Sequence, residues 1–292
     1  ISGGILTDAG DDYVHNTEDG RIFLTNDSID LGYGYNYFLN DGKIYADGAN
    51  NVINMGYYGG GEGGYYYGVF VNDGNSIHMN DGAADDALTI IGDFSGTGDV
   101  NVDVDGASLA SDTLYIYGNV LAGTANTINV DLISLPSAAD INAGETITIV
   151  EVSGSSAVTD FVLGDVNVAG GALFSADYSL VYDGSEFALG FDITGLTTAG
   201  VLLTSASPAI QNLWYGSLGT MYQRQGGERQ FLKDSGAADV HGAAGAWTRI
   251  YGSDGSITPS ANRNNFGDAG SQDFSFGNDG IEFGVGYSFT EA

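Results

Sequence analysis

The clearest hydrophobic pattern in the chain lies close to its last residue. In residues 281–289 every odd position is large and apolar, and every even position is small or polar. A two-residue period predicts a β-strand with one apolar face. Both a half-buried sandwich strand and an outer-membrane barrel strand fit this period, since the latter needs about 9–11 residues with apolar side chains toward lipid. The candidate lipid-facing residues are Ile281, Phe283, Val285, Tyr287 and Phe289.

A helical period precedes this strand. Ser207 is a candidate N-cap, Pro208 a candidate first helical residue, and Gly226 with Gly227 a stop signal. We therefore predict an amphipathic helix over about residues 208–224. Its apolar stripe consists of Ile210, Leu213, Trp214, Leu218 and Met221. The stripe fits a helix that caps a solenoid as well as a helix inside a barrel lumen, because both need one apolar face.

Short β-rich segments separated by turn signals fill residues 1–110. Asn-Asp-Gly stands at 40–42, 72–74 and 80–82 and predicts turns. Turns at roughly 8–12-residue spacing suit a sandwich or the rungs of a solenoid, and strands this short favour the solenoid. No exact repeat is visible. Within residues 99–106, the valines at 100, 102 and 104 are expected to point inward and the polar residues between them outward. From residue 113 to 192 the predicted strands are longer and more hydrophobic.

Composition and charge exclude several classes of function. The chain has 292 residues, no cysteine and a net charge of −31. Residues 1–223 contain only Arg21 and Lys43 as cations, against 29 acidic residues. Nucleic-acid binding is therefore excluded, because it needs a basic surface. Disulfides, thiol catalysis and cysteine-ligated zinc are excluded as well.

Four segments in order resemble the autotransporter family (type V secretion) at the junction of passenger and translocator. They are Ser111-Asp112-Thr113-Leu114 with Gly118-Asn119-Val120, Thr146–Val152, Tyr178–Gly184 and Gly245–Gly252. In that family the passenger is a right-handed parallel β-helix, a helix threads the barrel lumen, and the barrel holds the protein in the outer membrane. The resemblance implies a Gly/Asp-rich β-solenoid passenger in residues 1–110 and autochaperone-like C-terminal rungs in residues 111–195. It further implies a linker with the helix in residues 196–244 and the first barrel strands in residues 245–292.

A departure from the family concerns the barrel. A closed barrel needs at least about eight strands, and only two or three are predicted, so we expect the translocator to be incomplete. The expected fold class is thus all-β. It comprises a right-handed parallel β-helix (β-solenoid), one amphipathic helix and an incomplete antiparallel outer-membrane-type region.

Candidate chemistry is sparse. Asn101, Asp103 and Asp105 mimic the spacing of a calcium loop, although we favour a solvated strand face as their interpretation. Calcium is the only cofactor that we consider. Residues 59–64 match the letters of a dinucleotide loop but lack the following helix, so we interpret them as a flexible loop. The three histidines share no motif, and no nucleophile signature is present, so we predict that the protein is not an enzyme.

Tyrosines form the strongest candidate binding surface. Tyr33, Tyr35 and Tyr37 are expected on one face of a strand, and further tyrosines surround the glycine loop. Such rings can stack on sugars or contact a protein partner, or they can fill a core. The candidate surface-binding residues are Tyr33, Tyr35, Tyr37, Tyr65, Tyr66 and Tyr67.

Two hypotheses for function follow. The first is an adhesin or surface-coat passenger with the start of its outer-membrane anchor, located at the Gram-negative outer membrane and cell surface or released from it. Its partners would be the outer membrane, through the C-terminal strands, and a ligand on a host, a glycan or a neighbouring cell. The second is a structural subunit that self-associates into an extracellular filament or sheath, because solenoid ends are exposed edges.

Overall fold

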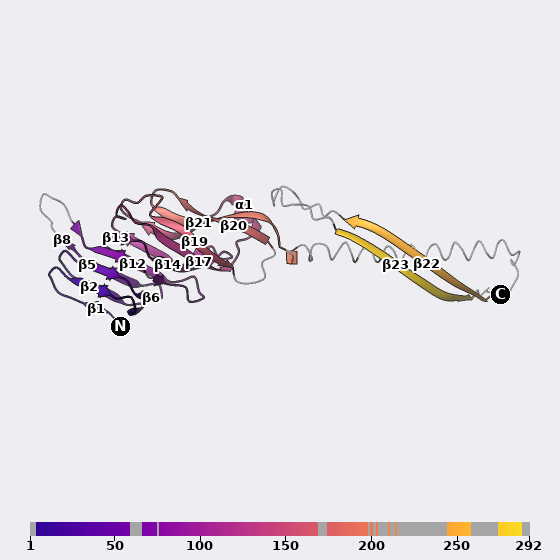
Figure 1. Cartoon of the computed structure of the whole chain (residues 1–292), viewed down its shortest axis with the longest axis horizontal. Helices are drawn as coiled ribbons and strands as arrows, with labels where there is room; N and C mark the ends of the chain where they lie inside the picture. Colours follow the sequence, from indigo (N-terminus) through magenta and orange to yellow (C-terminus); the bar gives the residue numbers. More distant parts are fainter. Residues whose placement is uncertain are drawn as a thin grey trace. The chain divides into compact units, whose positions relative to one another are not determined.

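The computed structural model describes residues 4–58, 66–74, 76–168, 174–197, 199–200, 203, 210, 214, 244–257 and 274–287. The chain divides into two compact units, Ile1–Thr194 and Gly195–Ala292, and each is described by itself (Figure 1). Strands dominate the described residues of both units, which confirms the all-β class.

In the described part of the first unit, three sheets have four or more strands each and most of their strand pairs are parallel, and a two-stranded hairpin forms a further small sheet (Figure 1). The first sheet has the order β1 (Ile5–Leu6), β4 (Ser28–Asp30), β7 (Asn51–Asn54), β12 (Ala87–Ile91), β16 (Thr113–Tyr117), β18 (Ile147–Val152), β21 (Glu186–Leu196) and β20 (Phe174–Tyr182). The second has the order β13 (Asp93–Gly96), β10 (Val69–Asn72), β5 (Tyr37–Asn40) and β2 (Tyr13–Asn16). The third has the order β19 (Phe161–Val168), β17 (Asn126–Ser134), β14 (Asp99–Asp105), β11 (Ser76–His78), β6 (Lys43–Asp47) and β3 (Arg21–Thr25), with β15 (Ala110–Ser111) antiparallel to β14.

The chain visits these sheets in a fixed cycle. It passes through the second, the third and then the first sheet, as in β2–β3–β4 and again in β5–β6–β7; we call one such passage a circuit. Tyr13 pairs with Tyr37, and Ile29 pairs with Ile53, so each partner lies 24 positions further on (37 − 13 and 53 − 29). The structure therefore contains a repeat that the sequence did not reveal.

Insertions hide this repeat. Tyr37 pairs with Val69, 32 positions on (69 − 37), because the antiparallel hairpin strands β8 (Tyr57–Tyr58) and β9 (Tyr66–Tyr67) intervene. Leu114 pairs with Val150, 36 positions on (150 − 114), and the helix α1 (Ala138–Ala143) lies between them. A capping box and a left-handed glycine at Gly144 delimit this short helix, which the sequence analysis did not predict.

The core between the three sheets is a set of stacked columns. Alternate residues of each strand point inward, so a residue and its register partner in the next circuit meet inside. One column is aromatic: neighbouring ring centroids lie 4.9–5.8 Å apart along Phe38, Phe70, Phe94, Phe161 and Phe187. The predicted inward valines at 100, 102 and 104 are fully buried, which confirms that part of the pattern.

Asparagines form a second, polar column at the end of the second sheet. The Nδ2 of Asn16 donates to Oδ1 of Asn40, Asn40 donates to Asn72, and Asn72 donates to Asn126, at 2.7, 2.9 and 2.9 Å. Gly96 occupies this register position in β13, at a φ of 113°. Because a Cβ on Gly96 would overlap the backbone of Asn72, glycine lets the Asn72 side chain reach past this strand to Asn126.

Two long strands characterise the second unit. β22 (Ala244–Ile257) and β23 (Phe274–Tyr287) pair antiparallel without a bulge, from Ala244 opposite Tyr287 to Ile257 opposite Phe274. Both strands are 14 residues long and exceed the predicted segments. Phe283 and Ile281, two of the candidate lipid-facing residues, are 76% and 59% exposed. Val285 and Tyr287 continue the same alternation on β23, and Phe289 lies outside the described residues.

The predicted linker helix falls mostly outside the described residues. Ile210 and Trp214 are helical, with 67% and 63% of their surfaces exposed, whereas Leu213, Leu218 and Met221 are not among the described residues. Within the described part of the chain, no helix is sufficiently long and apolar to cross a membrane.

Candidate functional site

The most prominent exposed feature of the first unit is a group of tyrosines on the second sheet and the turns that lead into it. Each exposes more than a third of its surface, which is unusual for large rings in this otherwise well-buried unit. They are Tyr13 (63%), Tyr33 (61%), Tyr35 (51%), Tyr57 (39%), Tyr37 (38%) and Tyr67 (38%), and we call them the tyrosine face.

Register brings these rings together. Tyr13 and Tyr37 are direct partners on β2 and β5, and their rings stack with centroids 5.6 Å apart and planes 2° from parallel. Tyr33 meets Tyr57 edge to face at 5.0 Å, and the two hydroxyls lie 3.4 Å apart. Tyr57 in turn pairs with Tyr67 across the β8–β9 hairpin. Flat rings that are held in place and exposed can stack on the apolar face of a sugar or on a partner's side chains.

The structure corrects one prediction about this group. Only Tyr37 lies in a strand, whereas Tyr33 and Tyr35 lie in the turn between β4 and β5. Gly32 adopts a left-handed φ of 68°, and a Cβ on Gly34 would overlap the carbonyl oxygen of Gly10 in the preceding circuit. The alternation of glycine and tyrosine thus reflects a tight turn packed on another turn, not a strand face.

Of the remaining predicted tyrosines, Tyr67 is exposed on β9. Tyr66 also belongs to β9, and Tyr65 lies outside the described residues. Tyr57 is one of the tyrosines expected to surround the glycine loop, whereas Tyr13 was not among the predicted tyrosines. Tyr13 joins the tyrosine face through the 24-position register, which the sequence did not reveal.

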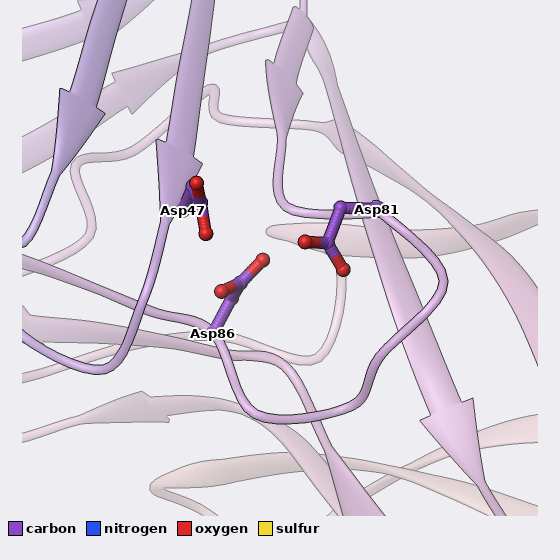
Figure 2. Close-up of side chains that lie close together, drawn as sticks. All are labelled: Asp47, Asp81 and Asp86. Atoms are coloured by element: carbon purple, nitrogen blue, oxygen red, sulfur yellow. The ribbon is translucent and has the colours of Figure 1, made fainter.

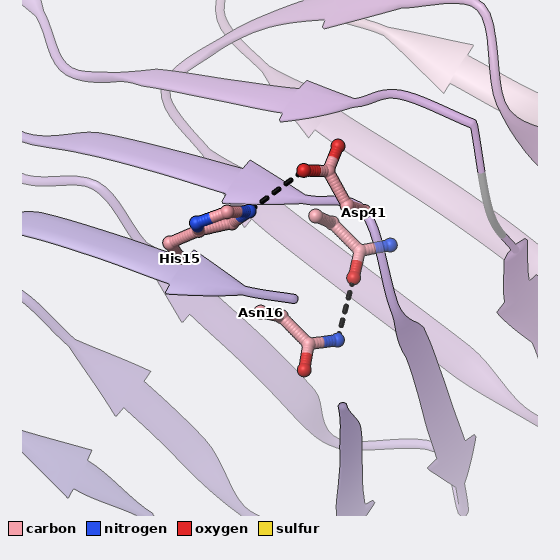
Figure 3. Close-up of polar contacts among 4 residues, drawn as sticks. His15, Asn16 and Asp41 are labelled. Carbon is pink, nitrogen blue, oxygen red and sulfur yellow. Dashed lines mark hydrogen bonds and ion pairs between the residues drawn. The ribbon is translucent and has the colours of Figure 1, made fainter. Parts of the chain in front are cut away.

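A polar pair borders the tyrosine face. His15 Nε2 lies 2.6 Å from Asp41 Oδ2, and both side chains are about one third exposed (Figure 3). The His15 ring also meets Tyr13 edge to face, with centroids 6.3 Å apart. An imidazole, a carboxylate and stacked rings side by side supply both hydrogen-bonding groups and an apolar platform, which is the composition of many carbohydrate-contacting surfaces.

A second aromatic column lies on the outer side of the third sheet. Phe23 stacks on Tyr45 at 4.8 Å, and Tyr45 stacks on His78 at 4.9 Å. Desolvation by burial lowers the pKa of His78, so its ring is neutral at physiological pH. His15 and His78 belong to different sheets, and His241 lies outside the described residues.

The calcium candidate on β14 does not converge on one point. Nδ2 of Asn101 donates to the Ile77 carbonyl, and Asp103 accepts the N–H of Gly82. Asp105 accepts hydrogen bonds from Ser134 and Ser108. Outward residues two positions apart on a strand are about 7 Å apart, so a single ion cannot be shared along this row without rearrangement. Calcium binding by Asn101, Asp103 and Asp105 stays a prediction.

Asp103 belongs instead to a group of buried carboxylates. Asp112 is fully buried and accepts the backbone N–H groups of Asp86 and Asp103, at 2.9 and 2.7 Å. Burial raises the pKa of Asp112 to about 7 and that of Asp86 to about 6, and it also raises the pKa of Asp103. Part of this group is therefore protonated near neutral pH.

Comparisons with known proteins add no assignment. No protein-family model matches the chain, and no curated protein matches it in sequence. The functional argument therefore depends on the residues and their geometry.

Proposed function

We propose that the protein is a non-enzymatic, autotransporter-type surface protein that binds ligands through its first unit. In this proposal the first unit is a right-handed parallel β-helix passenger and β22–β23 belong to its outer-membrane anchor. The observation that carries the passenger assignment is the cycle through three sheets, with partners 24 positions apart and continuous phenylalanine and asparagine columns. Each circuit buries its apolar face only against its neighbours, which is typical of a solenoid.

Support for the anchor comes from β22 and β23. Their 14 residues exceed the roughly 9–11 that cross a bilayer as a tilted strand. Exposed Ile281 and Phe283 on one face, together with small residues such as Gly284 on the other, match a strand that faces lipid on one side.

Adhesion is the function that the tyrosine face supports best. Its six rings are between 38% and 63% exposed, in a unit whose other large side chains mostly pack inside, and one of them, Tyr13, contacts His15 of the His15–Asp41 pair. Exposed aromatic patches of this kind mark interaction sites in soluble proteins. A glycan fits the combination of flat rings and hydrogen-bonding groups, and no basic residue is needed to hold it.

The membrane part of the proposal is tested by Phe283→Arg in cells that make the protein. An arginine toward lipid costs about 2–4 kcal/mol near mid-bilayer, so the amount in the outer membrane should fall and the amount degraded should rise. Asn278→Arg is the matched control, since it adds the same charge at a polar position of the same strand. Equal outer-membrane yields for the two variants would contradict the anchor assignment.

A filament subunit is the second candidate, and the sheet edges favour it. In the described part of the first unit, β2 and β3 each pair on one side only, and so does β1. Free edges can accept a strand of another copy. Sedimentation of the protein at increasing protein concentration in detergent-free buffer distinguishes the two candidates. Only the filament hypothesis predicts polymers in the absence of a membrane.

A further inference from the structure

Three carboxylates from neighbouring circuits converge where the chain turns from the third to the first sheet. Asp47 ends β6, and Asp81 and Asp86 lie in the connection between β11 and β12. Their carboxylate oxygens lie within 4.8 Å of one another, and Figure 2 shows the three groups facing a common space. This is the single such group of acidic or histidine side chains in the described part of the chain.

Asp86 is the unusual member of this acidic triad. Only 3% of its surface is exposed, and its Oδ1 accepts the N–H of Gly48. Its Oδ2 is buried and has no hydrogen-bond partner among the described residues, while Asp47 and Asp81 are both exposed. Burying a charged oxygen is unfavourable unless it is paired, so such an oxygen in a native protein usually has a hydrogen-bond donor or a cation beside it.

In the described part of this region, no positive charge compensates the three carboxylates. Asp81, Asp47 and Asp85 all act on Asp86 with the same sign. In residues 1–223 the sequence contains only Arg21 and Lys43 as cations. Like charges this close repel one another, and a cation bound between the three carboxylates would remove that repulsion.

We propose that Asp47, Asp81 and Asp86 bind a divalent cation, Ca²⁺ in preference to Mg²⁺. Ca²⁺ binds oxygen ligands at about 2.3–2.6 Å, so oxygens on opposite sides of the ion lie roughly 5 Å apart. One oxygen from each carboxylate of the triad lies within 4.8 Å of the other two, so all three fit around one ion. Two of the three carboxylates are exposed and adaptable, and water or carbonyl oxygens complete the 6–8 ligands that Ca²⁺ accepts. Mg²⁺ needs a stricter octahedron at about 2.0–2.1 Å and retains its waters.

Such an ion would join two circuits. Asp47 belongs to the β5–β6–β7 circuit, and Asp81 and Asp86 belong to the next one, β10–β11–β12. An ion that binds only the folded chain stabilises it, and above Kd this stabilisation grows with the logarithm of the ion concentration. The ion would thus clamp neighbouring circuits of an acidic protein at a corner, independently of where the protein resides.

Calorimetric titration of the full chain with CaCl₂ or MgCl₂, in a moderately saline buffer that screens loose binding, tests the proposal. We expect one Ca²⁺ per chain with Kd of about 10⁻⁴–10⁻³ M, as in extracellular calcium modules, and at least about tenfold weaker Mg²⁺ binding. Asp86→Asn should abolish this binding. Asp85→Asn, at the exposed neighbouring position, removes the same charge outside the triad and should leave the binding intact.

Stability provides the second readout. Ca²⁺ near ten times its Kd or more should raise the thermal midpoint by about 3–10 °C in the natural chain and in Asp85→Asn but not in Asp86→Asn. Without Ca²⁺, Asp86→Asn should be at least as stable as the natural chain, because it removes repulsion. If Asp86→Asn fails to fold, Asp81→Asn, at an exposed position, replaces it. Absence of saturable Ca²⁺ binding, or equal binding by the triad variant and Asp85→Asn, would overturn the proposal. The first outcome would leave a shared proton as the explanation of the close carboxylates, and the second would place the bound Ca²⁺ elsewhere on the chain.

Discussion

The buried asparagine column makes a sharp prediction at Asn72. This side chain is fully buried and lies in the middle of the column: Nδ2 donates to Asn126 and to the Asp99 carbonyl, and Oδ1 accepts from Asn40. Asn72→Ala removes all three bonds at once. It leaves the Asn40 amide and the Asn126 oxygen without their partners in the core, and each such loss costs about 1–3 kcal/mol. We therefore expect the free energy of unfolding to fall by about 3–5 kcal/mol.

The position of Asn16 supplies an internal comparison. It is the first residue of the column and donates to Asn40 and to the Lys43 carbonyl, but no asparagine of the described residues donates to it. Asn16→Ala should cost only about 1–2 kcal/mol, because fewer core groups lose a partner. Asn50→Ala, at an exposed turn position, should change stability by less than about 0.5 kcal/mol.

Urea denaturation of the three variants measures these differences, and a double-mutant cycle between Asn40 and Asn72 isolates their interaction. The coupling energy should be at least about 0.5 kcal/mol, as for directly bonded neighbours. Two results would refute this reasoning: Asn72→Ala lowers the free energy of unfolding no more than Asn16→Ala does, or the effects of substituting Asn40 and Asn72 are additive. Either result would mean that the asparagines do not act as a continuous hydrogen-bonded column.

Two further predictions concern the buried carboxylates and the tyrosine face. The pKa of Asp112 in the folded chain, about 7, lies above its unfolded value, so its contribution to stability is complete below about pH 4 and is lost as pH rises through 7. In the presence of a chelator, the free energy of unfolding measured with urea should be about 2 kcal/mol higher at pH 5.5 than at pH 7.5. If Asp112→Asn shows the same pH dependence, the effect does not come from Asp112. Tyr13→Ser with Tyr37→Ser should reduce binding on glycan arrays at least about tenfold without changing the thermal midpoint, whereas Tyr117→Ser, at an exposed position on another sheet, should not.

Local periods could be predicted from the sequence because they need no knowledge of distant residues. Alternation at Val100, Val102 and Val104 specifies which side of β14 enters the core, and the structure confirms it. The alternation at Ile281 and Phe283 likewise predicts a strand, and β23 contains it. What the sequence left open was which residues become neighbours in the next circuit.

Which residues pair between neighbouring circuits depends on the lengths of the insertions, and these lengths vary irregularly along the chain. The circuit that contains the β8–β9 hairpin is longer by eight positions, 32 instead of 24, so the repeat is lost to a simple search. Asp103 was predicted on an open outer face, yet it is buried because Gly82, from the previous circuit, donates to it. The triad was missed for the same reason: Asp47 and Asp86 are 39 positions apart (86 − 47) and meet only through the stacking of β7 on β12.

The choice between amide and carboxylate follows from the stacking itself. Neighbouring parallel strands are about 4.8 Å apart, so identical residues at one register position face each other directly. An asparagine can donate to one neighbour and accept from the other, and a column from Asn16 to Asn72 therefore satisfies itself inside the core. Aspartates in the same column would only accept and would repel. In a chain of net charge −31 the buried column accordingly uses amides, and the point where Asp47, Asp81 and Asp86 do meet is the point where a cation is needed.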